Sequence, residues 1–313
     1  MRQKVAIVGA GNVGATCAQR VLERGLADVA LVDVVDGLAE GKALDLNEAA
    51  PLEFHDRRIQ GSTSYRIIAG AEVVVVTAGL ARKPGMSRSD LLEANADIIQ
   101  QIIPNVVAHA PNAILLIVTN PLDVMTYLAL RLTGWPRQRV LGMAGVLDSA
   151  RLRYFVAERL GVSVKDVDAL VLGGHGDSMV AMARCTTVAG VPITELLPKA
   201  DIEALMQRTR DGGAEVVKLL KAGSAFYAPA SSAADMVQAV LLDEHRILPA
   251  CVYLEGEYGL KDLCCGVPIR LGKKGVEKIV EISLNPQEKS ALAASAQGIR
   301  KELDAVDALL APS

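Results

Sequence analysis

Short apolar runs alternate with longer segments of helical periodicity through the first half of the chain. The apolar runs lie near residues 4–8, 29–33, 73–77, 114–118 and 139–142, and the helical patterns near residues 12–24, 38–49, 90–108 and 121–133. Val73 to Val76 is wholly apolar, as expected for a strand that is buried on both faces of a parallel sheet. The alternation predicts a doubly wound parallel α/β sheet.

The pattern changes near residues 143–146. Long helical patterns follow at 147–160, 201–221 and 231–243, mixed with strand-like stretches at 166–172, 179–188 and 248–254, and residues 286–309 again have helical spacing. We therefore expect a first domain at residues 1–144 and an α+β domain at residues 145–313. Because no Pro/Ser-rich linker separates the halves, we expect them to pack closely.

The first apolar run ends in a glycine motif that carries chemistry. The motif is Gly-x-Gly-x-x-Gly, formed by Gly9, Ala10, Gly11, Asn12, Val13 and Gly14. In the dinucleotide-binding (Rossmann) fold these glycines allow a tight turn, close approach of the pyrophosphate and close packing of helix on strand. Asp33 lies 19 positions after Gly14 at the end of the next apolar run. A carboxylate there can bind ribose hydroxyls and would repel a 2′-phosphate, so the pattern favours NAD over NADP. The alternative is a glycine turn in another kind of βα unit.

Composition and charge narrow the function classes. Of the 313 residues 51% are hydrophobic and 22% are charged, and the net charge is −3, which gives no reason to expect a nucleic acid or an anionic membrane as partner. The apolar runs are too short to span a bilayer. The first run is interrupted by the glycine turn, so we expect no cleaved signal and a cytoplasmic location. The five cysteines lack C-x-x-C spacing and a nearby histidine pair, so reduced thiols and no metal site are expected.

A basic loop follows the third apolar run. Residues 80–89 contain Arg82, Lys83 and Arg88 together with Pro84 and Gly85. Ligands of open α/β sheets lie beyond the carboxyl ends of the strands, so these cations favour an anionic small molecule under a loop that closes over it. The alternative is a solvated basic turn.

His175 is the histidine best placed for proton transfer. Glycines flank it in the sequence Gly-Gly-His-Gly-Asp at residues 173–177, directly after a strand-like stretch. Asp148 and Arg151 are three positions apart on one face of a helical segment. They form either an ordinary helix ion pair or, if this face meets the cleft, a partner for His175 and a clamp for a carboxylate.

Five motifs together resemble one enzyme family. They are residues 9–14, residues 79–88 (Gly-Leu-Ala-Arg-Lys-Pro-Gly-Met-Ser-Arg), residues 118–123 (Val-Thr-Asn-Pro-Leu-Asp), residues 146–151 (Val-Leu-Asp-Ser-Ala-Arg) and residues 173–177. From residue 4 to the C-terminal helical segment the chain resembles the lactate/malate dehydrogenase family, in particular its malate dehydrogenases of the lactate-dehydrogenase-like group. The resemblance implies an NAD-dependent enzyme that interconverts (S)-malate and oxaloacetate, assembled as a homodimer or homotetramer.

The resemblance also implies roles for individual side chains. His175 matches the proton acceptor in alcohol oxidation, and Asp148 matches its partner. Arg151 matches the arginine that pairs with the C1 carboxylate, Arg88 the one that polarises the carbonyl oxygen, and Asn120 an amide that contacts the substrate. The matching cofactor contacts are Asn95, Val118, Thr119 and Asn120.

Arg82 is the position that selects the substrate in this resemblance, because malate enzymes have arginine there and lactate enzymes usually have glutamine. Oxaloacetate has a second carboxylate to pair with Arg82, whereas pyruvate would leave the guanidinium buried and unpaired, so lactate should be a poor substrate. The alternatives are a lactate dehydrogenase, a family-4-like NAD-dependent glycosidase and a catalytically silent NAD-binding protein. Arg82 argues against a lactate dehydrogenase, and the lack of a cysteine beside His175 argues against the glycosidase. The silent binding protein is disfavoured because it gives no reason for the joint presence of Arg82, Arg88, Arg151 and His175.

Overall fold

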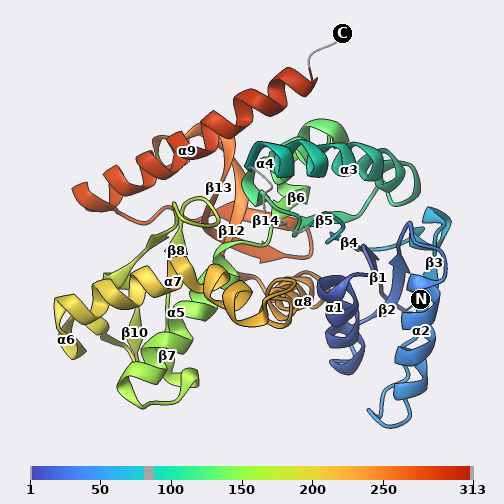
Figure 1. Ribbon diagram of the computed structural model, residues 1–313, viewed down its shortest axis with the longest axis horizontal. Coiled ribbons are helices and arrows are strands. Elements are labelled where there is room, and N and C mark those ends of the chain that lie inside the picture. The colour runs from blue at the N-terminus through green and yellow to red at the C-terminus, as the bar shows by residue number, and fades with distance from the viewer. Residues whose placement is uncertain (1, 81–87, 311–313) are drawn as a thin grey trace.

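The chain forms one long sheet with helices on both faces, beside a smaller region of helices and short strands with its own buried cluster, in a computed structural model that describes residues 2–80 and 88–310 (Figure 1). The helices are α1 (Asn12–Glu23), α2 (Leu38–Ala49), α3 (Arg88–His109), α4 (Leu122–Thr133), α5 (Gly145–Leu160), α6 (Ile193–Leu196), α7 (Lys199–Leu220), α8 (Tyr227–Leu241) and α9 (Pro286–Leu310). The strands are β1 (Lys4–Val8), β2 (Asp28–Val32), β3 (Ile59–Ser62), β4 (Val73–Val76), β5 (Ile114–Ile117), β6 (Val140–Gly142), β7 (Val167–Asp168), β8 (Val171–Leu172), β9 (Val180–Ala181), β10 (Thr187–Val188), β11 (Val191–Pro192), β12 (Arg246–Glu255), β13 (Lys261–Gly272) and β14 (Gly275–Ile279).

The large sheet confirms the expected doubly wound fold. Its strand order is β14-β13-β12-β6-β5-β4-β1-β2-β3, in which the six strands from β3 to β6 are parallel and follow the order 3-2-1-4-5-6. Every residue of β4 and of β5 is buried, which explains why both runs are apolar throughout. In doubly wound sheets ligands bind beyond the carboxyl ends of the strands where the strand order reverses, which here are β1 and β4.

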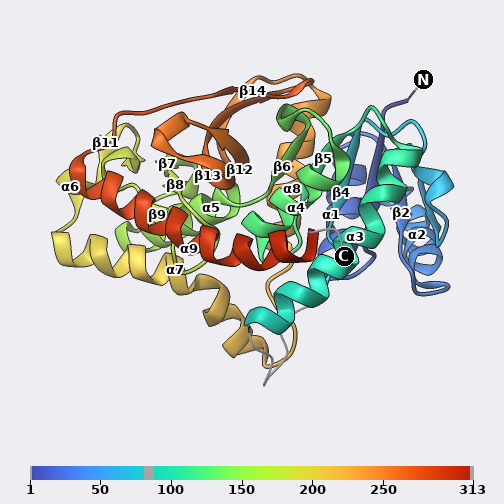
Figure 2. The ribbon, with the colours of Figure 1, turned by 90° about the horizontal axis from the view of Figure 1, so that it is seen from above.

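The two halves of the chain share this sheet and its core. The antiparallel strands β12, β13 and β14 of the second half extend the sheet, and Cys251 of β12 pairs with Gly142 of β6. α1 packs against α8, and α4 contacts both α3 and α9. Figure 1 shows α3, α4 and α9 above the sheet with α1 and α8 below it, and Figure 2 shows α9 running along the second half. One buried cluster extends from Val5 to Val306, so the halves pack closely, as expected.

Several strands differ from the expected pattern. The stretch 166–172 is two strands, because β7 pairs with β10 in one small sheet and β8 pairs with β9 in another. The stretch 179–188 is likewise divided between β9 and β10. The apolar runs at 4–8 and 248–254 and the helical pattern at 38–49 fall on β1, β12 and α2, whereas the pattern did not predict β3, β11, β13 or β14. Among the described residues, no helix is both long enough and apolar enough to cross a membrane.

Candidate active site

The glycine motif forms the turn between β1 and α1, and its three glycines meet different surroundings. Gly9 has φ +107°, and a Cβ on it would lie 2.6 Å from the amide nitrogen of Ala78. A Cβ on Gly14 would lie 1.8 Å from the carbonyl oxygen of Gly9. A Cβ on Gly11 would have no neighbour within 4 Å. Two glycines therefore permit close packing, and the third keeps one side of the turn open to a ligand.

The start of α1 suits an anionic group. Gly11 precedes the helix and provides no side-chain cap, so the first N–H groups of α1 have no side-chain acceptor at that position. Asp33, at the end of β2, accepts a hydrogen bond from the N–H of Ala10 to Oδ2 at 2.6 Å and from the N–H of Val35 to Oδ1 at 3.0 Å. Nζ of Lys42 donates to the carbonyl oxygen of Ala10 at 2.6 Å, a contact that the sequence pattern did not indicate. An open turn, a helix terminus and an adjacent carboxylate fit a dinucleotide.

The residues after β4 and β5 are joined by side-chain hydrogen bonds. Asn95 is fully buried, donates from Nδ2 to the carbonyl oxygen of Asn120 at 2.7 Å, and accepts the N–H of Leu80 at 2.7 Å. Oγ1 of Thr119 donates to the carbonyl oxygen of Ala78 at 2.7 Å. Asn95 and Thr119 thus hold the strand ends together, while Asn120 itself is exposed. Direct contact of Asn95, Val118 and Thr119 with a cofactor stays a prediction.

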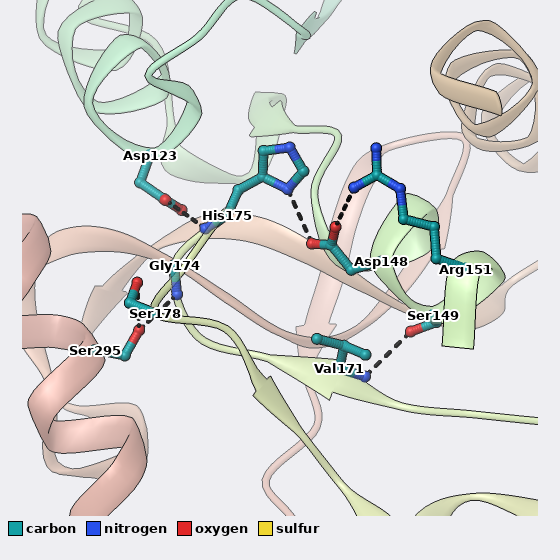
Figure 3. Close-up of polar contacts among 9 residues, drawn as sticks. All are labelled: Asp123, Asp148, Ser149, Arg151, Val171, Gly174, His175, Ser178 and Ser295. Atoms are coloured by element: carbon teal, nitrogen blue, oxygen red, sulfur yellow. Dashed lines mark hydrogen bonds and ion pairs between the residues drawn. The ribbon is translucent and has the colours of Figure 1, made fainter. Parts of the chain in front are cut away.

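His175, Asp148 and Arg151 come together, as their spacing allowed (Figure 3). Nδ1 of His175 lies 2.9 Å from Oδ2 of Asp148, and the second oxygen of that carboxylate lies 3.4 Å from NH1 of Arg151. Figure 3 shows the carboxylate of Asp148 between the imidazole of His175 and the guanidinium of Arg151. Asp148 is 2% exposed, whereas the side chains of His175 and Arg151 are 15% and 16% exposed. A buried carboxylate thus orients two groups that can still be reached by a small ligand.

The surroundings of His175 favour its protonated form. Burial opposes the charge and would lower the pKa of the imidazole, but the charge and hydrogen bond of Asp148 and the charge of Asp123 outweigh it and raise the pKa above its ordinary value. Burial lowers the pKa of Arg151, which Asp148 partly offsets. Because the carboxylate of Asp148 accepts a hydrogen bond from the Nδ1–H group, Nε2 on the other side of the ring can exchange a proton with a substrate.

Residues that the sequence did not single out support these groups. Oγ of Ser295, on α9, accepts the N–H of Gly174 at 2.8 Å, and Oγ of Ser149 accepts the N–H of Val171 at 3.1 Å. A Cβ on Gly212 of α7 would lie 3.1 Å from Cδ of Arg151, so this glycine makes room for the arginine stem. None of these contacts follows a periodicity, because each joins segments that are distant in the sequence.

Two of the expected substrate residues cannot be placed against this site. Arg82 lies outside the described residues, and so does the side chain of Arg88, which is the first residue of α3. Their expected contacts with a substrate remain predictions.

The other histidines lie in separate surroundings. His109 ends α3, and His55 is half-buried and accepts the N–H of Arg57 at 3.3 Å. His245 is exposed and forms, with Asp243 and Glu277, the single group in the described part of the chain that could hold a metal ion. Nε of Arg270 already lies 2.9 Å from the same Glu277 oxygen that contacts His245, so a cation neutralises this carboxylate.

A dinucleotide-type turn on a doubly wound sheet, together with an imidazole–carboxylate pair beside an arginine, defines a dinucleotide-dependent oxidoreductase. Residues 3–142 match the NAD-binding domain of lactate/malate dehydrogenase, and residues 145–310 match the alpha/beta C-terminal domain. The chain belongs to the lactate/malate dehydrogenase family and is an NAD-dependent enzyme.

The similar proteins are named either malate dehydrogenase or lactate dehydrogenase. The chain is 56% identical over 307 residues to the malate dehydrogenase of Synechocystis sp., covering 98% of this chain and 95% of that protein, and 54% identical to that of Thermomicrobium roseum, covering 99% and 100%. The structure of Cryptosporidium parvum malate dehydrogenase superposes with a TM-score of 0.96 at 40% identity, covering 98% of this chain and 100% of that one. The structure of the lactate dehydrogenase from the same organism superposes with a TM-score of 0.95 at 38% sequence identity, covering 100% of this chain and 99% of that one. The fold therefore does not distinguish the two substrates.

Proposed function

We propose that this chain is an NAD-dependent malate dehydrogenase that interconverts (S)-malate and oxaloacetate. The observation that carries the proposal is the carboxylate of Asp148, which contacts Nδ1 of His175 at 2.9 Å and NH1 of Arg151 at 3.4 Å. The identities of 51–56% to proteins named malate dehydrogenase support the choice of substrate. NAD, when bound, supplies the hydride acceptor.

The side chains have distinct tasks in this proposal. In malate oxidation the neutral imidazole of His175 takes the hydroxyl proton at Nε2, and Asp148 stabilises the imidazolium that forms. The guanidinium of Arg151 pairs with the C1 carboxylate through two parallel hydrogen bonds, which fixes the C2 atom near the imidazole. In the reverse direction the protonated His175 donates to the ketone oxygen, and the resemblance gives Arg88 the task of polarising that oxygen.

We place the boundary between the two domains at residues 144 and 145. The end of β6 at Gly142 and the start of α5 at Gly145 support this position, as do the matches to residues 3–142 and 145–310. The cofactor turn then belongs to the first domain, and His175, Asp148 and Arg151 belong to the second. Catalysis would need both domains in their present arrangement.

A homodimer or homotetramer and a cytoplasmic location complete the proposal. Exposed apolar side chains on and after α2 support an assembly, since Leu44 is 60%, Leu52 77% and Phe54 94% exposed. The five cysteines form no disulfide, in keeping with a reducing compartment. Analytical ultracentrifugation measures the assembly, and a monomer at micromolar concentration would contradict this part of the proposal.

The substrate assignment is tested by the rate of NADH oxidation with oxaloacetate and with pyruvate. We expect kcat/KM for oxaloacetate to exceed that for pyruvate by on the order of 10⁴, because pyruvate cannot pair with the second guanidinium. Arg82→Gln should lower this ratio at least tenfold. The matched variant Arg153→Gln should leave the ratio unchanged, because the guanidinium of Arg153 donates to the backbone carbonyl oxygens of residues 164 and 167. Faster use of pyruvate by the wild-type chain would contradict the assignment.

A further inference from the structure

Asp123 is a buried carboxylate to which neither the sequence motifs nor the proposed reaction gives a task. It lies in the first turn of α4 and is 6% exposed. Its Oδ2 accepts the backbone N–H of His175 at 2.8 Å, a contact visible in Figure 3. Its Oδ1 is buried and has no hydrogen-bond partner among the described residues. Burying a carboxylate with one oxygen unpaired is costly, so its presence needs an explanation.

Two neighbouring strands place thiols around this carboxyl group. The thiol of Cys251, on β12, interacts with the carboxyl group of Asp123. The charge of Asp123 also helps to raise the pKa of Cys265, on β13. Both cysteines are fully buried. The α5 residues Asp148 and Arg151 face His175 from the other side, where Asp148 contacts Nδ1. His175 therefore lies between two carboxyl groups, one at its ring and one at its backbone.

We propose that Asp123 is a positioning residue that holds the backbone of His175 through its N–H and places a second carboxyl group near the imidazole. The inference rests on the proposed function, in which His175 exchanges the proton of the substrate. The hydrogen bond to Asp123 fixes the position of the His175 backbone, and the hydrogen bond to Asp148 fixes the orientation of the imidazole ring. A second negative charge in a site of low polarity stabilises the imidazolium, as Asp148 does.

The ionisation behaviour of the two residues agrees with this arrangement. The pKa of Asp123 is raised to about 6, mainly by burial and to a smaller extent by the charge of Asp148. The N–H of His175, the thiol of Cys251 and the charge of His175 oppose this increase. Asp123 in turn contributes to the raised pKa of His175. At a pH above about 6 Asp123 is ionised and favours the protonated imidazole. Among the described residues, Cys251 of β12, Cys265 of β13, and Asp148 and Arg151 of α5 are the other titratable or charged groups that act on this pair.

The test compares pH profiles of kcat/KM for malate oxidation in the wild-type chain and in Asp123→Asn. Asparagine keeps an acceptor for the His175 N–H and removes the charge. Oxidation needs neutral His175, so we expect the fall of kcat/KM on the acidic side of the profile (the acidic limb) to occur at a lower pH in the variant. At a fixed pH on this limb, kcat/KM as a fraction of its maximum should then be about threefold to tenfold higher than in the wild-type chain. The alkaline limb of oxaloacetate reduction should move in the same direction. A residue that only supports the fold would lower both plateaus and leave the limbs in place, and unmoved limbs would overturn the inference.

A second variant keeps the test decisive if Asp123→Asn does not fold. Cys251→Ala removes a group that favours the ionised form of Asp123, so it should move the acidic limb in the same direction by a smaller amount. Cys17→Ala removes the same atoms from another fully buried position, in α1, and should leave the limb in place. An unmoved limb in Cys251→Ala, or an equal movement in Cys17→Ala, would contradict the inference.

The variant His175→Asn separates the two proposals. If it oxidises malate at the wild-type rate, the proposed function fails. If it loses turnover while the limbs of Asp123→Asn and Cys251→Ala stay in place, the role of Asp123 alone is wrong.

Discussion

Replacing Asp123 with asparagine should change how the free energy of unfolding depends on pH. The carboxyl group has a pKa of about 6 in the folded chain, compared with 3.8 for the unperturbed group. The folded state therefore holds this proton more tightly than the unfolded state does. The stability that the group contributes is fully present below the unfolded pKa and is lost as the pH rises through the folded one.

The size of this effect follows from the shift. A difference of about 2 pKa units corresponds to about 3 kcal/mol, since each unit is worth about 1.4 kcal/mol. The wild-type chain should lose this amount between about pH 4 and pH 7, and Asp123→Asn should not. The substitution also leaves an amide facing Cys251, but that cost is the same at every pH. The difference in unfolding free energy between the two chains should therefore shift by about 3 kcal/mol in favour of the variant across this range.

Urea denaturation at a fixed protein concentration measures this difference, with the fluorescence of Trp135, the single tryptophan, as the signal. The matched control is Asp97→Asn, which makes the same substitution at an exposed position of α3. A difference between Asp123→Asn and the wild-type chain that stays constant across this range, or a shift no larger than that of Asp97→Asn, would refute the reasoning, because it would mean that the buried carboxyl group does not titrate in this range.

Three further predictions concern the catalytic groups and the cofactor turn. Asp148→Asn should reduce kcat in both directions by on the order of 10²–10⁴ without changing the dissociation constant of NADH, because the imidazole loses the group that orients and stabilises it; an unchanged kcat would contradict that role. Arg151→Lys should raise the KM for oxaloacetate about tenfold or more, since an ammonium cannot form two parallel hydrogen bonds, and Arg153→Lys should not. Gly14→Ala should weaken NADH binding, measured by fluorescence titration, at least about tenfold, because the new methyl group would lie 1.8 Å from the carbonyl oxygen of Gly9 and displace the turn; wild-type affinity would show that the turn can adapt.

The direction of the reaction should depend on pH through His175. Its raised pKa means that the protonated form needed for oxaloacetate reduction persists to a higher pH than in a free imidazole. Reduction should decline, and malate oxidation should increase, as the pH rises through this pKa. Initial rates in both directions between about pH 5 and pH 10 check this, and parallel profiles for the two directions would contradict it.

The sequence predicted the parts of the fold that depend on local patterns. The runs at β1, β4 and β5 are apolar because both faces of these strands are covered, and the glycine turn is recognisable because close packing at Gly14 tolerates no side chain. The sequence pattern did not predict β13. Gly266 and Pro268 interrupt its pattern, yet Pro268 lies opposite Pro249 in β12, and the long hairpin tolerates both because the surrounding pairs are in register.

The sequence predicted the main groups of the candidate site, and not the contacts that hold them. His175, Asp148 and Arg151 each lie in a short motif, and the structure brings these three together. The contact between Asp123 and His175 joins a side chain to a backbone group 52 positions away, so neither residue type nor spacing indicates it. Gly212 likewise makes room for Arg151 from another helix. Such contacts depend on how helices pack, which local patterns do not specify.

The central claim is that His175 exchanges the substrate proton, and His175→Asn tests it most directly. The rate of NAD reduction with saturating malate and the dissociation constant of NADH would be measured for the wild-type and variant chains. The account predicts a loss of kcat of at least about a hundredfold, with an unchanged dissociation constant, because the cofactor turn lies between β1 and α1 and does not involve the imidazole. A variant that retains more than about a tenth of the wild-type kcat would contradict the claim.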